Sequence, residues 1–249
     1  MTAPVRTDPP ALDEQVRVLA AQTDRTWGPV DAALGVLAVP AALALGLVAL
    51  TVVPALGGGL ATALSSLVLT VLVLAASRRA ARQSGGLRRA LGADLPGPGD
   101  VGQVLGWAAL LLAAQTAALG VLTSLVPALR GVPVDNISFL REQGLATVLV
   151  VVVSAVVVAP VLEELLFRGL VLRGLMLRVG FWPAAVVSSV FFGLFHAQTV
   201  GVDALPLVAA TGVFGLGLCV LVRRTGRLGP AIGVHALRNS LAVGVVLLG

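Results

Sequence analysis

The chain has 249 residues, of which 57% are hydrophobic and only 12% are charged, and its mean hydropathy is +1.00. Because soluble globular domains carry roughly 25% charged residues, this composition excludes that class and predicts a protein that crosses a bilayer several times. All 17 basic residues are arginines, and they gather at the ends of apolar segments. This placement favours a role in membrane orientation and argues against a nucleic-acid partner.

Residues 1–26 are polar and include Pro4, Pro9 and Pro10. We expect a cytoplasmic N-terminal segment over residues 1–29, with a short amphipathic helix at the membrane surface over residues 11–27. A secretory signal is not predicted, because acidic residues outnumber arginines before the first apolar run and no compact apolar core precedes a small-residue cleavage site.

The apolar segments predict an all-α fold, a polytopic transmembrane helical bundle with about seven spans. We place the spans at about residues 30–53, 60–76, 101–126, 145–162, 182–196, 204–222 and 230–248. The proline and glycines of residues 54–59 predict a tight turn between the first two spans. Residues 30–144 are expected to form N-terminal transmembrane helices and loops, with a surface loop over residues 77–100.

The arginines predict how the protein is oriented. Clusters within residues 77–100, 168–178 and 223–227 fall on one side of the membrane if the spans alternate, and positively charged loops face the cytoplasm. We therefore expect a multi-pass protein of the cell inner (plasma) membrane with a cytoplasmic N-terminus.

Two adjacent acids, Glu163 and Glu164, follow a long valine-rich run, where a charge at membrane depth costs about 2.5 to 3.5 kcal/mol. Arg168 lies four residues after Glu164, in the favourable order for an ion pair on a helix. Successive helical residues point about 100° apart, so Glu163 faces elsewhere, and a glutamate in an apolar site can act as a general base. The alternative is an ordinary helix end with a surface salt bridge.

Both histidines of the chain occur in the same half as these acids. His196 closes an apolar segment, and Phe192, one turn earlier, can pack on its ring. His235 and Asn239 are four residues apart and share one helix face. Each pair alone is more typical of an interfacial histidine or of an interhelical hydrogen bond than of a catalytic site.

Simple alternation of spans places Glu163 and His196 at different depths. Two arrangements would bring them together: a helix that continues into the membrane beyond a kink at Pro160, which we favour, or a water-filled cavity that reaches deep from the inner side. A carboxylate, two imidazoles and an amide at one point would suit hydrolysis of a peptide bond, which needs a base for water and a stabiliser for the oxyanion.

The three motifs resemble those of the CPBP intramembrane proteases, which include the type II CAAX prenyl endopeptidases and the Abi bacteriocin-processing or immunity proteins. They are Glu163-Glu164-x-x-x-Arg168, Phe192-x-x-x-His196 and His235-x-x-x-Asn239. The resemblance covers residues 145–249, which it implies are the catalytic core. The implied substrate is a peptide or a membrane-protein segment in the lipid bilayer.

The resemblance also implies roles for the residues. Glu163 with His196 would activate water, His235 and Asn239 would orient it or stabilise the oxyanion, and Glu164, Arg168 and Phe192 would support them. No metal is expected to be tightly bound; a divalent ion such as zinc would take Glu163, His196 and His235 as ligands. By helical phase, Arg238 is expected to point away from Asn239 towards the surface.

Two other classes of function remain open from the sequence. In a catalytically silent scaffold or bacteriocin-immunity protein, the cluster would only hold helices together or bind a partner. In a proton-coupled transporter, Glu163 and His196 would form a relay.

Overall fold

The computed structural model describes residues 13–14, 57–134, 137–197 and 201–248, and within these ranges it is all-α without a strand. The α-helices are α3 (Gly57–Ser84), α4 (Leu87–Leu91), α5 (Val101–Leu125), α6 (Leu145–Val153), α7 (Ala159–Glu164), α8 (Arg173–Val179), α9 (Phe181–Phe195), α10 (Leu205–Thr225) and α11 (Gly229–Leu248). The π-helical segments are η5 (Ser154–Val158) and η6 (Leu165–Leu172), and the 3-10 segments are η2 (Pro98–Asp100), η3 (Pro127–Leu129), η4 (Ser138–Glu142) and η7 (Val202–Ala204).

The predicted membrane bundle is confirmed. In the described part of the chain, four segments are long and apolar enough to cross a bilayer, namely residues 98–125, 145–179, 202–225 and 229–248. The predicted span at residues 30–53 lies outside the described residues, as does the predicted surface helix at residues 11–27 apart from residues 13 and 14. The loop predicted to begin at residue 77 is wrong at its start, because α3 continues to Ser84 and ends where Gly85 and Gly86 take φ values of 76° and 130°.

The longest helical segment runs without a break from α6 through η5, α7 and η6 to α8, a total of 35 residues. The predicted end of this span at residue 162 is therefore wrong. The acids do not end the apolar segment, since Glu164 and Arg168 are paired inside the protein and both are fully buried. The helix continues through Glu163, as the first of the two arrangements requires, whereas the kink at Pro160 and the depth of Glu163 in the membrane stay predictions.

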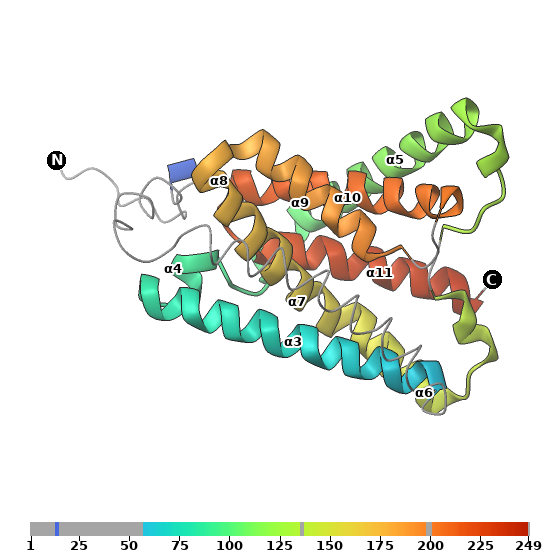
Figure 1. Ribbon diagram of the computed structural model, residues 1–249, viewed down its shortest axis with the longest axis horizontal. Helices are drawn as coiled ribbons and strands as arrows, with labels where there is room; N and C mark the ends of the chain where they lie inside the picture. Colours follow the sequence, from blue (N-terminus) through green and yellow to red (C-terminus); the bar gives the residue numbers. More distant parts are fainter. Residues whose placement is uncertain (1–12, 15–56, 135–136, 198–200, 249) are drawn as a thin grey trace.

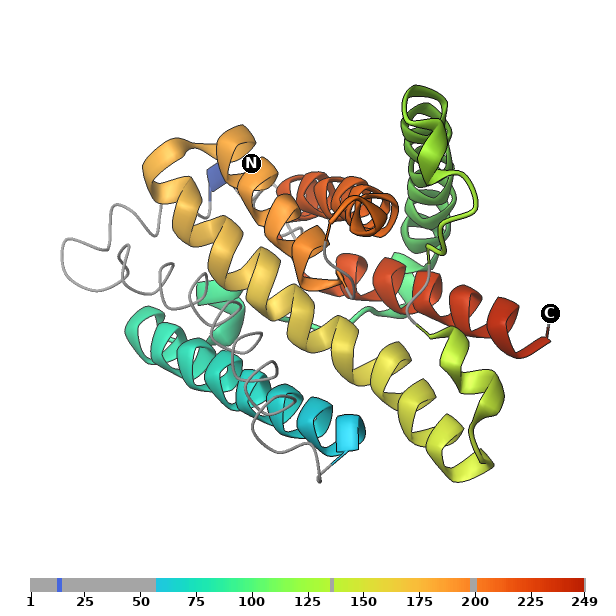
Figure 2. The same ribbon diagram turned by 45° about the vertical axis from the view of Figure 1, so that its right-hand side comes forward.

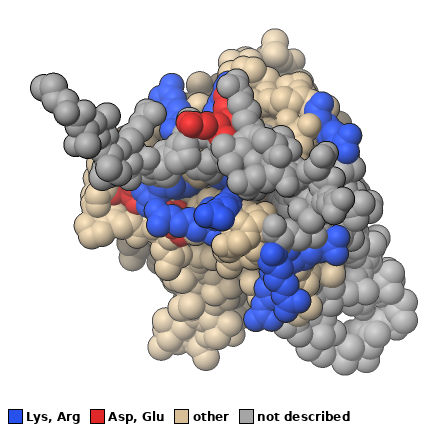
Figure 3. All heavy atoms as spheres, turned by 90° about the vertical axis from the view of Figure 1, so that its left-hand side faces the viewer, with Lys and Arg blue, Asp and Glu red and all other residues tan. Residues whose placement is uncertain are grey.

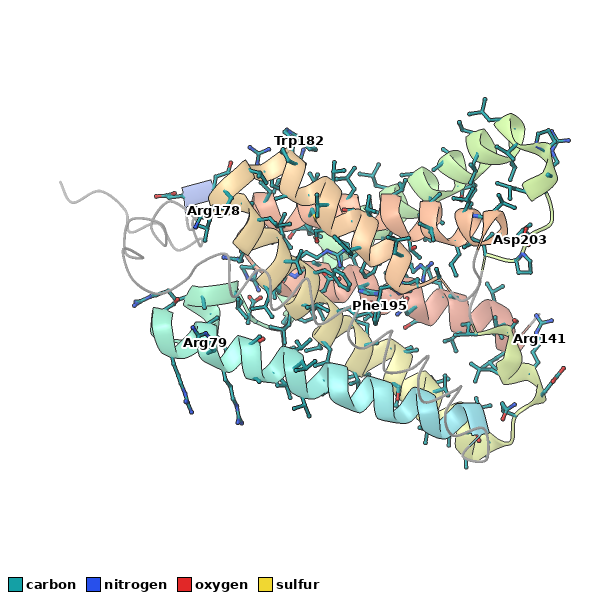
Figure 4. All side chains as sticks on the ribbon, in the orientation of Figure 1. Arg79, Arg141, Arg178, Trp182, Phe195 and Asp203 are labelled. Atoms are coloured by element: carbon teal, nitrogen blue, oxygen red, sulfur yellow. The ribbon has the colours of Figure 1, made fainter. Side chains whose placement is uncertain are left out.

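The helix α9 has only 15 residues, a length of about 22 Å, so it ends part-way along the bundle. Figure 4 shows Phe195, its last residue, midway between the end that carries Arg79 and Arg178 and the end that carries Arg141 and Asp203. This short helix brings His196 to the level of the middle of the long helix, where Glu163 lies.

The other long helices pack around these two. The helix α3 lies along the long helix on one side, whereas α10 and α5 lie on the opposite side, and α11 runs between them (Figures 1 and 2). The core includes the buried rings of Phe167, Phe192 and Phe214. The long helix, α9 and α10 each contribute one of these rings to the core.

One end of the bundle is rich in arginine. The last turns of α3, α4, α8 and α10 meet there (Figure 1), and Figure 3 shows the basic side chains gathered on this face. They include Arg82, Arg88, Arg89, Arg178, Arg223 and Arg224. Arg168 and Arg173, which were predicted to belong to this side, are instead fully buried. The assignment of this end to the cytoplasm stays a prediction.

At this end, the loop after α4 is joined to the turn between α10 and α11. The N–H of Leu228 donates to the carbonyl of Gly92 at 2.9 Å, and Arg173 Nη2 donates to the carbonyl of Gly226 at 2.9 Å. Both glycines have left-handed backbones, and a Cβ on Gly92 would lie 2.5 Å from the Gly226 oxygen. Any other residue at position 92 would separate the two loops.

A charged cluster completes this junction. Arg227 pairs with Asp94 and with Asp100, and Asp94 Oδ1 also accepts the N–H of Gly229 at 2.7 Å, at the start of α11. Partial burial acts to lower the pKa of Arg227, but its hydrogen bonds to Asp94 and Asp100 raise it above the ordinary value. The cluster fixes the position of the first residues of α11, the helix that carries His235.

The helices α9 and α10 touch at Gly193. A Cβ at this position would lie 2.6 Å from the carbonyl oxygen of Val208, which is closer than real Cβ atoms come to backbone. The absence of a side chain at Gly193 thus lets α10 approach α9 closely.

We expect Gly193→Ala to lower the free energy of unfolding of the detergent-solubilised protein by about 1 to 3 kcal/mol, and hence its melting temperature, because the added methyl group forces α9 and α10 apart. The matched control is Gly120→Ala in α5, where an added Cβ meets nothing within 4 Å. Thermal unfolding followed by circular dichroism compares the two, and equal melting temperatures would contradict the packing described.

Candidate active site

Three ionisable side chains from separate helical segments meet in the middle of the bundle. Glu163 Oε2 lies 3.6 Å from Nε2 of His196 and 3.8 Å from Nε2 of His235. The Glu163 and His196 side chains are each 12% exposed, and that of His235 is 1% exposed. Positions that are 33 and 72 residues beyond Glu163 (196 − 163 and 235 − 163) are therefore brought within reach of one small ligand.

The hydrogen bonds of the two rings fix which nitrogen faces Glu163. His196 Nδ1 lies 2.8 Å from the carbonyl of Phe192, and His235 Nδ1 lies 2.9 Å from Glu164 Oε1. Because both partners are acceptors, each Nδ1 carries a hydrogen, and in the neutral rings each Nε2 presents a lone pair. Three acceptor atoms thus converge: two ring nitrogens and one carboxylate oxygen.

Glu164 joins two elements of the site. Its Oε1 accepts from Arg168 Nη1 at 2.9 Å as well as from His235 Nδ1, so the neighbouring acid orients one of the two histidines. Arg168 in turn donates through Nη2 to the carbonyl of Gly215 in α10 at 3.1 Å. The sequence indicated the ion pair but not the bond to His235, because helical spacing carries no information on α11.

Aromatic rings hold the imidazoles from the sides. The ring of Phe192 lies 4.6 Å from that of His196 and 5.7 Å from that of His235, measured between centroids. Phe214 packs edge-on against His235 at 5.6 Å, and the Arg168 guanidinium lies 4.3 Å from the Phe192 ring centre. The two histidines are therefore restrained by packing as well as by hydrogen bonds.

A pocket of about 160 Å³ opens next to these groups. Its wall consists of Val134, Ile137, Ala155, Ala159, Glu163, His196, Leu207, Thr211, Arg238, Asn239, Ala242 and Val243. Small and aliphatic side chains make up most of this list, and the polar ones are Glu163, His196, Thr211, Arg238 and Asn239.

Asn239 lines this pocket and also binds the backbone of the long helix. Within η5, the N–H of Ala159 donates to the carbonyl of Ser154, five residues back, and the next residue, Pro160, has no N–H to offer Ala155. Asn239 Nδ2 donates to the Ala155 carbonyl at 2.8 Å. The amide thereby supplies the hydrogen that the proline lacks.

Arg238 does not lie where the sequence predicted. Its side chain lines the pocket, donates through Nη1 to Asn239 Oδ1 at 3.2 Å, and lies 5.6 Å from the ring centre of Phe214. The expectation that it points to the surface is wrong, because an arginine side chain is long enough to reach the pocket from a flanking position on the helix. The site therefore contains a cation that the motifs do not include.

Glu163, His196 and His235 can also be considered as ligands of a metal ion. Two imidazole nitrogens and a carboxylate are a donor set that zinc accepts. Among the described residues, however, no group of three or more His, Cys, Asp or Glu side chains has the geometry to hold a metal ion. Glu163 Oε2 is buried and has no hydrogen-bond partner in this part of the chain, so a small ligand that donates hydrogens fits the three acceptors.

Comparison with protein families gives one match. Residues 145–241 match the family described as type II CAAX prenyl endopeptidase Rce1-like. The matched region extends from α6 into α11, includes every residue of the three motifs, and confirms the resemblance inferred from them. No curated protein and no solved structure matches the chain.

We expect Arg168→Met to destabilise the protein by about 3 to 5 kcal/mol, because it leaves the Glu164 carboxylate buried without its cation. The double variant Glu164→Gln/Arg168→Met should recover part of this loss. Melting temperature and yield in detergent measure both, with the exposed Arg224→Met as the matched control. A single variant as stable as the control would show that the buried pair does not support the fold.

Proposed function

We propose that the Rce1-like domain of residues 145–241 is a membrane-embedded endopeptidase that hydrolyses a peptide bond in its pocket with Glu163 as the base. The observation that carries this proposal is the meeting of a buried carboxylate with two imidazole nitrogens, at 3.6 and 3.8 Å, beside a pocket. The family supports a CAAX-type membrane protease in general; the assignment of roles to individual residues is ours.

In this mechanism, a water molecule lies between the three acceptors. The water can donate one hydrogen to the Glu163 carboxylate and the other to the Nε2 lone pair of His196 or His235, which leaves a water lone pair directed at the substrate. Glu163 takes a proton as the water oxygen attacks the carbonyl carbon. When the carbon–nitrogen bond breaks, the same carboxylic acid returns the proton to the leaving amine.

The remaining residues of the motifs support these steps. Glu164 and Arg168 orient His235, and Phe192 orients His196 through its carbonyl and its ring. Asn239 holds the pocket wall at Ala155, and its second amide hydrogen can bind the substrate or the water. If a zinc ion were bound, Glu163, His196 and His235 would hold it, and it would supply Lewis-acid activation of the water.

We further propose a location and a substrate class. The arginine-rich end of the bundle would face the cytoplasm of the inner membrane, which agrees with the bias of positive charge in membrane proteins. The pocket wall of small aliphatic side chains suits a peptide or a membrane-protein segment that reaches the site from within the bilayer.

We expect Glu163→Gln to abolish cleavage, with a loss of at least about 100-fold, because the amide cannot accept the proton of water. Cells that make the wild type or this variant are compared by labelling new protein N-termini in their membranes and identifying them by mass spectrometry. Gly120→Ala is the control, and size-exclusion chromatography verifies equal amounts of folded protein. If the two sets of N-termini are the same, the protein is a scaffold or a transporter and not a protease.

We expect this cleavage to need no added metal ion, since the three acceptors can orient water directly. Membranes that contain the wild type are treated with 1,10-phenanthroline, and the N-termini that depend on Glu163 are then counted over time. Unchanged rates are the expected result. Loss of cleavage that zinc restores would show that the three side chains act as metal ligands.

A further inference from the structure

Arg238 is a charged group of the pocket to which none of the motifs assigns a role. It is half-buried, and no carboxylate of the described residues lies within the 4.0 Å of an ion pair from its guanidinium. Its one hydrogen bond within the described chain uses a single N–H, on Asn239 Oδ1. A cation at membrane depth without a paired acid is a functional-site hypothesis.

The other polar side chains of the pocket have little left to donate. Glu163 only accepts, and His196 uses its Nδ1 hydrogen on the Phe192 carbonyl. Thr211 donates its hydroxyl to the carbonyl of Leu207 at 2.6 Å. Asn239 uses one amide hydrogen on Ala155. Arg238, with five N–H groups and one of them occupied, is thus the main source of donors on the pocket wall.

Glu163 and Arg238 line the same pocket, so a peptide carbonyl bound there can contact both of them. Glu163 and Arg238 both line a cavity of about 160 Å³, yet their charged groups are farther apart than an ion pair. A carbonyl between them would have its carbon towards the water at Glu163 and its oxygen towards the guanidinium. Attack by water turns this oxygen into an alkoxide, which a cation in a low-dielectric site stabilises strongly.

We propose that Arg238 binds the carbonyl oxygen of the scissile peptide bond and stabilises the oxyanion that forms when water attacks. This rests on the proposed peptidase function and adds a catalytic residue to it. In the step, the water oxygen bonds to the carbonyl carbon, the carbonyl electron pair moves to its oxygen, and Glu163 receives the proton. Arg238 donates hydrogen bonds throughout and exchanges no proton.

Asn239 is a positioning residue in this arrangement. Its Oδ1 accepts from Arg238 Nη1, and its Nδ2 donates to the Ala155 carbonyl, so one amide links the guanidinium to the helix that bears Glu163. The position of the Arg238 guanidinium is thereby fixed relative to that of the Glu163 carboxylate. A guanidinium fixed in this way loses little freedom when the substrate binds.

The experiment compares wild type with Arg238→Gln, Arg238→Lys and Arg238→Ala by the labelling of new membrane N-termini, at equal amounts of folded protein. Arg224→Gln, an exposed arginine at the end of α10, is the control. We expect a loss of about 100-fold with Gln and about tenfold with Lys, applied evenly to all cleavage sites. In membranes with Arg238→Ala, added guanidinium chloride should restore cleavage at least fivefold, whereas urea should not.

The alternatives give different results. An Arg238→Gln rate within threefold of the Arg224→Gln rate, or no rescue by guanidinium, overturns the proposal. The proposal is also overturned if Arg238→Gln stops cleavage at some bonds and leaves the rates at the remaining bonds unchanged. That result would assign Arg238 to recognition of a carboxylate in the substrate. A failure of the proposed peptidase function is distinguished from these results, because in that case the wild type and Glu163→Gln give the same set of N-termini.

Discussion

The arrangement of the site depends on how one carboxylate is kept in the interior. Glu164 has no exposed surface, and isolated burial of a charge would cost several kcal/mol. Arg168 and His235 both bind its Oε1, one from the same helix and one from α11. The requirement to satisfy this acid therefore joins the long helix to α11, and Arg168 extends the connection to Gly215 in α10.

Because of this connection, the neighbouring residues Glu163 and Glu164 have different roles. Glu164 points into the protein and orients His235, whereas Glu163 points to the pocket and meets both ring nitrogens. Since His235 uses Nδ1 on Glu164, only its Nε2 remains for the pocket side. The charge network thus sets both the position and the tautomer of a residue in the proposed reaction.

The sequence allowed part of this to be predicted. Spacing along helices indicated that Glu163 and Glu164 face different directions and that Glu164 can pair with Arg168, because both statements need only the geometry of one helix. The depth at which Glu163 meets His196 depended on where helices end. Charged residues were taken to end a span at residue 162, yet packing and pairing let the helix continue.

Side-chain direction was harder to predict than backbone position. Helical phase separates Arg238 from Asn239 by about 100°, but an arginine is long enough to reach a pocket from a flanking direction. The link between Asn239 and Ala155 was also hidden, since it requires a π-helical turn before Pro160. No short motif encodes which carbonyl a proline leaves free.

That π-helical turn has a consequence for the outer surface of the long helix. A turn closed over five residues accommodates one more residue than an α-helical turn, so it acts like a single-residue insertion and shifts the helical phase by about 100°. None of residues 145–153, which precede it, is buried, whereas Pro160 and Glu164 after it are. The π-helical turn thus lies between a part of the helix with no buried residue and the part that carries the acids, and it sets the direction in which the acids point relative to the residues before it.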